Sequence, residues 1–239
     1  MERLAVACLN EEILLVATNE LVSRDADLAA IVERFGPPPL WARPPGFSTL
    51  VQIMLEQQVS LASAFAAFDR LRAAVDPLTP DGFLGLNDRE LLVIGFSHQK
   101  ARYVRGLARA LTTRSFDLDR LVNLPDDEVH RELVALIGVG PWTAGIYMME
   151  ALLRPDVWPV ADMALVASVA QVKGLDRRPG PTEMEAIGEA WRPWRSVAAR
   201  LFWHDYLGRR GRPLTAPEVA PDPGIEAATS STPAGGTLT

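Results

Sequence analysis

The chain has 239 residues, 48% of them hydrophobic, and a formal net charge of −6 at pH 7. This length suits one domain or two small subdomains that share a core. No apolar run approaches the roughly 18 residues of a membrane span, and residues 1–20 carry acids rather than the basic flank of a signal peptide, so we expect a cytoplasmic protein with no membrane partner. The one cysteine, Cys8, excludes an intrachain disulfide and a four-cysteine iron–sulfur cluster.

The charges are distributed unevenly along the chain. Residues 216–239 contribute −3 of the net charge, because they hold three acids and no Lys or Arg. Residues 91–116 hold no acid and five basic side chains, here called the basic stripe: Lys100, Arg102, Arg105, Arg109 and Arg114. Arg102, Arg105 and Arg109 share one helical face. The basic stripe either binds a polyanion such as nucleic acid, against the acidic balance of the whole chain, or is an ordinary solvated face.

The first half of the chain alternates helical runs with turn signals. Residues 1–20 have helical character but no clear cap, so we treat residues 1–23 as an N-terminal extension without assigned function. Caps and periodicity predict helices over residues 25–35, 47–57, 60–75 and 87–95, followed by the helix that carries the basic stripe.

A polar corner joins two of these helices. Glu56, Gln57 and Gln58 end the amphipathic run that begins at Phe47, and Ser60 caps the next helix. We expect Gln57 and Gln58 to project from this turn. They either contact a ligand there or satisfy local backbone groups.

The histidines do not indicate a metal site. His98, His130 and His204 are far apart in the sequence, and none has a Cys or His at ligand spacing. We therefore predict no zinc site.

A tight helical hairpin is the most informative stretch. A helical run over residues 127–136 ends in Gly138-Val139-Gly140, and Pro141 opens the next helix. Glycine permits a positive φ in such a turn, and proline at a first helical position loses no hydrogen bond. The bare backbone N–H groups at the start of the second helix form an anion site that a phosphate fits.

The rest of the chain reads as further helices and a tail. Asp162 precedes an apolar helix over residues 163–172, and Thr182 with Glu185 predicts a capping box for a helix that ends at Trp191. A last helix is predicted over residues 194–207. Residues 209–239 are too poor in apolar residues to fold and are expected to be disordered. No segment shows sustained strand alternation, so the fold class is all-α.

Four motifs together resemble a known family. They are Leu136-Ile137-Gly138-Val139-Gly140 with Thr143-Ala144, Val160-Ala161-Asp162, Trp191 to Ser196, and Leu55 to Ser60. This set resembles the helix-hairpin-helix DNA glycosylases of base excision repair, in particular the 3-methyladenine DNA glycosylase II (AlkA-like) branch, over roughly residues 24 to 208. The resemblance implies two helical subdomains with the active-site cleft between them, the hairpin lying within residues 127–152. It also implies a compact form without the N-terminal β domain of larger relatives.

The resemblance implies roles for residues of the cleft. Asp162 corresponds to the catalytic aspartate, although an Asp at this place is also an ordinary N-cap. Trp142 stands where members that also cleave the strand carry Lys, which implies a monofunctional hydrolase. Trp142 and Trp203 would line the base pocket, the alternative being core packing, and Ile146 replaces a Tyr of close relatives, which implies a more open pocket.

The resemblance also implies how DNA is held. Gln58, with Gln57 beside it, would be the wedge that fills the gap left by the extruded nucleotide. The residues implied or expected to bind the DNA backbone are Gly138, Val139, Gly140, Thr143, Lys100, Arg102 and Arg105. The carbonyls of Val134, Leu136 and Val139 match those that hold a monovalent cation, Na⁺ or K⁺, and no other cofactor is implied.

These features predict a monomeric, monofunctional glycosylase that removes alkylated bases of the 3-methyladenine and 7-methylguanine type from double-stranded DNA. Three alternatives remain open at this point. They are a glycosylase for oxidised or mismatched bases, a non-catalytic helix-hairpin-helix DNA-binding protein, and a helical protein–protein module. Asp162 discriminates the first reading from the non-catalytic ones.

Overall fold

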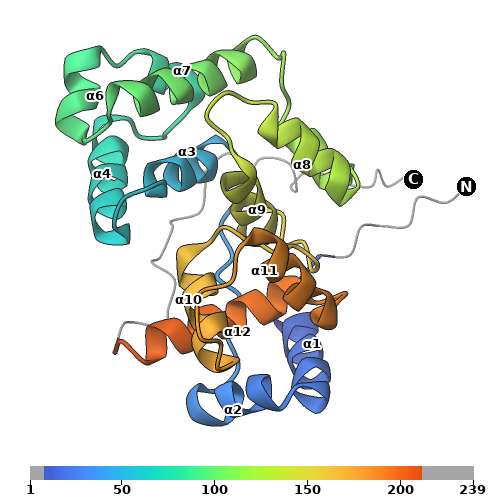
Figure 1. Cartoon of the computed structure of the whole chain (residues 1–239). Coiled ribbons are helices and arrows are strands. Elements are labelled where there is room, and N and C mark those ends of the chain that lie inside the picture. Colours follow the sequence, from blue (N-terminus) through green and yellow to red (C-terminus); the bar gives the residue numbers. More distant parts are fainter. Residues whose placement is uncertain (1–7, 212–239) are drawn as a thin grey trace, which may run out of the picture.

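A computed structural model describes residues 8–211, and every regular element in that range is a helix (Figure 1). The α-helices are α1 (Glu11–Arg24), α2 (Ala26–Phe35), α3 (Phe47–Glu56), α4 (Leu61–Ala74), α5 (Pro80–Leu84), α6 (Asp88–Ile94), α7 (His98–Thr112), α8 (Asp126–Val134), α9 (Pro141–Glu150), α10 (Met163–Val172), α11 (Pro181–Gly188) and α12 (Arg195–Gly208). Two short 3-10 helices, η1 (Asp119–Asn123) and η2 (Glu189–Trp191), complete the list. None of the described helices combines the length and the apolarity that a membrane span requires. The all-α prediction is confirmed for the described residues.

The helices form two groups, each around its own hydrophobic core. The first core is built by α3 to α9 and includes Leu50, Phe83, Leu107 and Tyr147, all nearly inaccessible to solvent. In Figure 1 these helices occupy the upper part of the molecule, and α9 descends from them towards the second group. The two predicted subdomains therefore exist as two packed cores.

The second core combines both ends of the described chain. Leu14 and Leu21 of α1 and Leu28 of α2 pack with residues of α10 and α12, such as Phe202. Residues 8–23, the described part of the predicted extension, thus contribute to this core, so the boundary placed between residues 23 and 24 does not coincide with a break in packing. The predicted tail lies outside the described residues from residue 212 onwards.

Most helix starts follow the caps that the sequence indicates. Ser60 caps α4, Asn87 caps α6 with Glu90 completing the capping box, and Asp162 caps α10. The capping box that we predicted at Thr182 is wrong. Because Pro181 takes the first helical position, α11 begins earlier, and the N–H of Gly180 donates to Glu183 Oε2 at 2.8 Å.

Buried polar contacts attach the segment that links the two groups to α3 and α9 of the first group. Arg43, in the extended segment between α2 and α3, pairs with Glu56 at 2.8 Å and with Glu150 at 2.6 Å. The hydroxyl of Tyr147 accepts the N–H of Gly46 at 2.9 Å, at the start of α3. Trp203 and Val157 pack against both cores, so the groups meet along α9 and α12.

Candidate functional site

Asp162 accepts three hydrogen bonds where α10 begins. Its Oδ1 accepts the N–H of Leu165 at 2.8 Å and the indole Nε1–H of Trp203 at 3.0 Å. Its Oδ2 accepts the indole Nε1–H of Trp142 at 2.9 Å. The residue is therefore both an N-cap and a carboxylate held in one orientation by side chains from α9 and α12. The half-buried Asp162 keeps acceptor capacity, most of it on Oδ2, which has a single donor.

The aromatic residues expected at the base pocket lie against this carboxylate. Trp142 and Trp203 are half-buried, and Trp41 meets Trp203 edge to face at 6.3 Å between ring centroids. Sequence reasoning missed Trp41, whose only signal was its place in a proline-rich segment. Ile146 is not at an open wall, because its side chain is 3% exposed and belongs to the first core.

The hairpin between α8 and α9 needs one of its two glycines for conformation. Gly138 has φ of 91°, and a Cβ built on it would lie 2.4 Å from Cγ of Tyr103 on α7. Gly140 has φ of −90° and is the N-cap of α9, and a Cβ there would meet no atom within 4 Å. We expected both glycines to be required, and the structure assigns that requirement to Gly138 alone.

The start of α9 presents backbone donors. No side chain caps this helix. Within the described residues, the hydrogen bonds give no protein acceptor to the N–H groups of Gly140, Trp142 and Thr143. Val139 is buried and anchors the loop, whereas Ile137 at its tip is 76% exposed. Thr143 is 1% exposed and its Oγ1 accepts from Gln57, so its side chain is not available to a ligand.

The two glutamines of the polar corner point in different directions. Gln58 is exposed and has φ of 56°. Gln57 turns inward, and its Nε2 donates to the carbonyl of Gly138 at 3.0 Å and to Oγ1 of Thr143 at 2.8 Å. The wedge role that we expected for Gln57 does not fit this position, because the amide is engaged by the hairpin.

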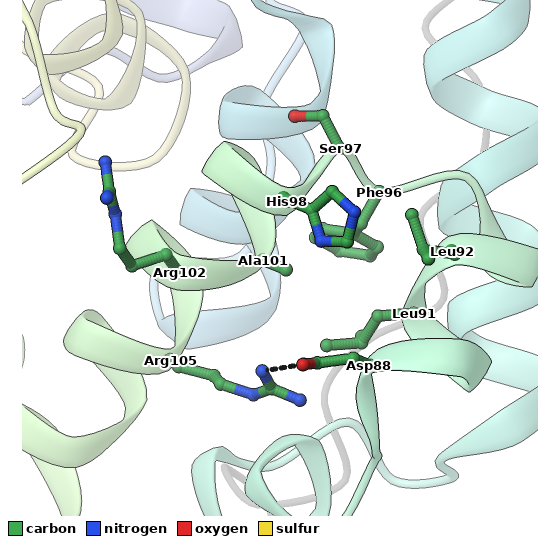
Figure 2. A pocket seen from close by; sticks show the side chains of 9 residues that line it. All are labelled: Asp88, Leu91, Leu92, Phe96, Ser97, His98, Ala101, Arg102 and Arg105. Carbon is green, nitrogen blue, oxygen red and sulfur yellow. Dashed lines mark hydrogen bonds and ion pairs between the residues drawn. The ribbon is translucent and has the colours of Figure 1, made fainter.

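The basic stripe is also less available than its sequence suggests. Lys100 Nζ donates to the carbonyls of Leu55 at 2.6 Å and Gln57 at 2.9 Å. Arg105 pairs with Asp88 and donates to the carbonyl of Leu86 at 2.9 Å (Figure 2). These two residues therefore spend part of their donor capacity inside the protein, two of the three ammonium hydrogens in the case of Lys100.

Arg102 is the member of the basic stripe that fits the expected role best. It is exposed and extends away from the Arg105–Asp88 pair in Figure 2. The hollow drawn there, about 180 Å³ in volume, is lined by Asp88, Leu91, Leu92, Phe96, Ser97, His98, Ala101, Arg102 and Arg105. Because its acidic Asp88 is already paired with Arg105, we assign this hollow no ligand.

A larger cavity of about 520 Å³ lies on the other side of Trp142. Its walls come from α8, α9, the segment 157–161 and α11, and include Trp158 and Ala161. Asp162 and Trp203 do not line it. Trp142 therefore lines this cavity and also contacts the carboxylate, whereas Trp203 and Ile146, the other residues expected at the base pocket, do not line the cavity.

A buried charge network lies close to the site. Glu150, at the end of α9, faces Arg43, Glu56, Arg200 and Asp162. Burial, with smaller contributions from Glu56 and Asp162, raises the pKa of Glu150 to about 7, although Arg43 and Arg200 oppose the shift. Sequence reasoning missed this network, because nothing local shows that an arginine and two glutamates as far apart in the sequence as Arg43 and Glu150 will be buried together.

The backbone of the hairpin fits a monovalent cation in part. The implied ligands are the carbonyls of Val134, Leu136 and Val139; Val134 is the last residue of α8, and the other two lie in the short loop that closes the hairpin. The Leu136 carbonyl also accepts the N–H of Val139 at 3.0 Å. A carbonyl oxygen has two lone pairs, so this bond leaves it able to coordinate a cation.

Comparisons with known proteins agree with this geometry. Residues 51–194 match the family model described as HhH-GPD superfamily base excision DNA repair protein. A Bacillus subtilis protein named DNA-3-methyladenine glycosylase is 26% identical over 169 residues, which cover 66% of this chain and 56% of the relative. The chain spans only 64% of the length of another Bacillus subtilis relative that it matches.

Solved structures share the fold. A DNA-3-methyladenine glycosidase from Bacillus halodurans superposes with a TM-score of 0.68 at 26% identity, covering 84% of this chain and 93% of that one. The 3-methyladenine DNA glycosylase of Schizosaccharomyces pombe bound to abasic DNA gives a TM-score of 0.72 at 21% identity, covering 78% and 94%.

Proposed function

Because the chain belongs to the HhH-GPD superfamily of base excision DNA repair proteins, we propose that it is a DNA glycosylase that hydrolyses the N-glycosidic bond of alkylated bases in duplex DNA. The observation that carries the proposal is the convergence of Trp142, Trp203 and the N–H of Leu165 on Asp162. The relatives named as 3-methyladenine glycosylases support the substrate class. The proposed partner is duplex DNA, so the protein would act in the compartment that contains the DNA. A single copy of the chain would supply every residue of the site, so we propose a monomer.

The chemistry requires a fixed negative group beside the sugar. As the base departs, positive charge develops on the deoxyribose. A carboxylate that is already oriented stabilises this charge better than one that must first reorient. Asp162 is held at both oxygens, so it needs no reorganisation when the charge appears. The acceptor capacity left on Oδ2 suits a water molecule that attacks the sugar, with Asp162 orienting it and accepting its proton.

The start of α9 would hold the DNA backbone. Its free N–H groups and the positive end of the helix dipole attract a phosphate without using a charged side chain. This accounts for DNA binding by a protein of net negative charge. Arg102 would add one ionic contact.

Trp142 supports a hydrolase without strand cleavage. A lyase step of the Schiff-base type needs an amine at the sugar, and the Trp142 indole that faces Asp162 has none. The reaction would end at an abasic site. Treatment of the wild-type protein and damaged DNA with borohydride should then trap no covalent complex.

Aromatic side chains support a cationic substrate. Electron-rich indole rings attract a purine that alkylation has made positive, through stacking and cation–π interaction. Trp142 and Trp203 contact the carboxylate, and Trp41 packs against Trp203. Such a base also leaves easily, so 3-methyladenine and 7-methylguanine should be released faster than neutral lesions such as 8-oxoguanine.

We also propose that the hairpin holds Na⁺ or K⁺ through the carbonyls of Val134, Leu136 and Val139. The bound cation would supply positive charge next to a bound phosphate and would keep the three carbonyls together. The chemical step depends on Asp162 and requires no other cofactor.

The test of the proposed function is Asp162→Asn, which keeps the shape and removes the charge. We expect DNA binding within a few-fold of wild type and loss of base release from methylated duplex by at least ~10²-fold. Asp25→Asn is the matched control, because Asp25 also caps a helix and accepts an indole N–H, from Trp191 at 2.8 Å. Base release by Asp162→Asn at the wild-type rate would overturn the proposal.

A further inference from the structure

We propose that Lys100 and Gln57 are positioning residues that fix the turn at Gln58 against the hairpin, so that they govern base extrusion and not the binding of the DNA backbone. This inference rests on the proposed function, because it concerns how a glycosylase opens the duplex. It assigns to two residues of the expected DNA interface a role that the sequence did not indicate.

The turn that ends α3 has a backbone that needs support. Gln57 has φ of −59° and ψ of 123°, and Gln58 follows with φ of 56°. These are the central positions of a turn that normally takes glycine at its second position, because a side chain there crowds the backbone. A non-glycine residue keeps this conformation only when its surroundings impose it, and such residues gather at functional sites.

The side chains around this turn suit insertion into a stack of bases. Gln58 is exposed at its tip. Val59 and Leu61, the apolar residues that follow it, are both 48% exposed. Apolar and amide side chains on a protruding turn can enter between bases, whereas a turn that only caps a helix has no need of exposed apolar groups.

Lys100 holds the turn from the side of α7. Its ammonium donates to the carbonyls of Leu55 and Gln57, which are the unsatisfied acceptors at the end of α3. Two of the three ammonium hydrogens are thereby used inside the protein. Partial burial lowers the pKa of Lys100 below its ordinary value, as expected for a group that points inward.

Gln57 ties the same turn to the hairpin. Its amide donates to the Gly138 carbonyl in the loop and to Oγ1 of Thr143 in the first turn of α9. Thr143 is 1% exposed, so this contact is closed to solvent on the hairpin side. Tyr103 of α7 packs on Gly138 from outside, and its hydroxyl accepts from Gln99 Nε2 at 2.6 Å.

One helix therefore holds both parts of the DNA-facing surface. Lys100 and Tyr103 lie one helical turn apart on α7, and they contact the turn and the hairpin respectively. Once the start of α9 grips a phosphate, the distance from that phosphate to Gln58 is set by these contacts. Loss of the Lys100 or Gln57 contacts should leave phosphate binding at the start of α9 unchanged. It should weaken the insertion of Gln58 into the gap left by the extruded base.

The experiment uses Lys100→Met and Gln57→Met in the full chain, and it measures three quantities for each. The first is the salt dependence of binding to undamaged duplex. The second is the fluorescence of 2-aminopurine placed beside the lesion, which reports extrusion. The third is the single-turnover rate of base release from methylated duplex. We expect an unchanged salt slope, with extrusion signal and rate both reduced about tenfold or more in each variant.

Two further variants make the result specific. Arg70→Met is the matched structural control, because Arg70 Nε donates to the Ile94 carbonyl at the end of α6 at 2.8 Å, far along the chain from the turn. It should lower the melting temperature without changing extrusion. Arg102→Met should lower the salt slope by about one unit, as expected when one phosphate contact is lost.

The outcomes separate this inference from the proposed function. A salt slope that falls by about one unit in Lys100→Met, with an unchanged single-turnover rate, would identify a phosphate ligand and overturn the inference. Unchanged extrusion in folded Gln57→Met, or an equal loss in Arg70→Met, would also overturn it. If the wild type releases no base from any alkylated duplex, the proposed function fails instead.

Discussion

Two indole N–H groups act on a single carboxylate in this protein. Trp142 and Trp203 come from different helices and reach opposite oxygens of Asp162. An indole has only one polar group, and it is a donor, so it can orient a carboxylate without competing for the attacking water. In the proposed function each tryptophan therefore has two uses: its ring would contact the base, and its N–H holds the carboxylate of Asp162.

Trp203→Phe tests the second of these uses. The substitution keeps an aromatic ring and removes the donor to Oδ1, so the rate of base release should fall about tenfold, since a hydrogen bond to a charged group contributes roughly 1.5–3 kcal/mol. Single-turnover kinetics on methylated duplex gives the rate. Trp191→Phe removes the equivalent donor to Asp25 and serves as the control. Equal rates in the two variants would mean that the indole donor does not matter for catalysis.

The identity of the key residues could be predicted, but their contacts could not. The family resemblance placed Asp162, Trp142 and Trp203 in one site, and the structure brings all three together. The sequence did not show that the indoles bond to the carboxylate, or that Ile146 is buried. Those facts depend on the rotation of side chains from three helices, which motif spacing does not determine.

At the scale of the element, the hairpin depends on one backbone conformation. Gly138 combines a positive φ with the close approach of Tyr103, whereas Gly140 has neither constraint. Two glycines that look equivalent in the motif therefore differ in what they tolerate.

Gly138→Ala should disrupt the hairpin and Gly140→Ala should not. In the first, a β-carbon would overlap the Tyr103 ring, and left-handed backbone costs about 1–2 kcal/mol for a residue with a side chain. We expect DNA affinity to fall at least tenfold, with a lower melting temperature. Gly140→Ala should bind DNA within a few-fold of wild type, which fluorescence anisotropy can measure. Similar affinities for the two variants would show that the φ of Gly138 is not needed for binding.

Local signals predicted the elements, and distant contacts escaped prediction. Caps such as Ser60 and Asn87 act within three residues, so the sequence located the starts of α4 and α6. Lys100 reaches a carbonyl 43 residues away, and Gln57 reaches one 81 residues away. A basic run in the sequence cannot show which of its members bond to such distant carbonyls. For this reason the basic stripe looked larger than the structure makes it.

At the scale of the whole molecule, buried charges anchor the segment that links the two cores. Arg43 lies in that segment, and it pairs with Glu56 of α3 and Glu150 of α9. Fold class was predictable from the absence of strand alternation. This network was not, because the three residues carry no motif and become neighbours only when α3, α9 and the linking segment pack together.

The Glu150 network predicts a pH-dependent stability. Because burial raises the pKa of Glu150 from 4.5 to about 7, the native state binds its proton more tightly than the unfolded chain does. This contribution to the free energy of unfolding is fully present below pH 4.5 and is lost as the pH rises through 7, a change on the order of 3 kcal/mol.

Glu150→Gln removes the titrating group and should flatten that part of the stability curve. Urea unfolding of both proteins at pH 5, 6, 7 and 8 provides the measurement. Asp126→Asn is a suitable comparison. Burial also raises the pKa of the Asp126 carboxyl, but this carboxyl interacts with Arg154 and Arg195 and not with Arg43. Parallel stability curves for wild type and Glu150→Gln would contradict the assignment.

The course of the chain between the two cores has a consequence for synthesis on the ribosome. The helices α3 to α9 are contiguous and can bury their apolar faces against one another as soon as they have emerged. The helices α1 and α2 emerge first, but their partner α12 begins about 160 residues after α2 ends. At a synthesis rate of about 5–20 residues per second, roughly 10 to 30 s pass between the synthesis of α2 and that of α12, and the apolar faces of α1 and α2 lack their partner during that time. During this interval the unpaired apolar faces of α1 and α2 are open to chaperones, to proteases and to association with other nascent chains.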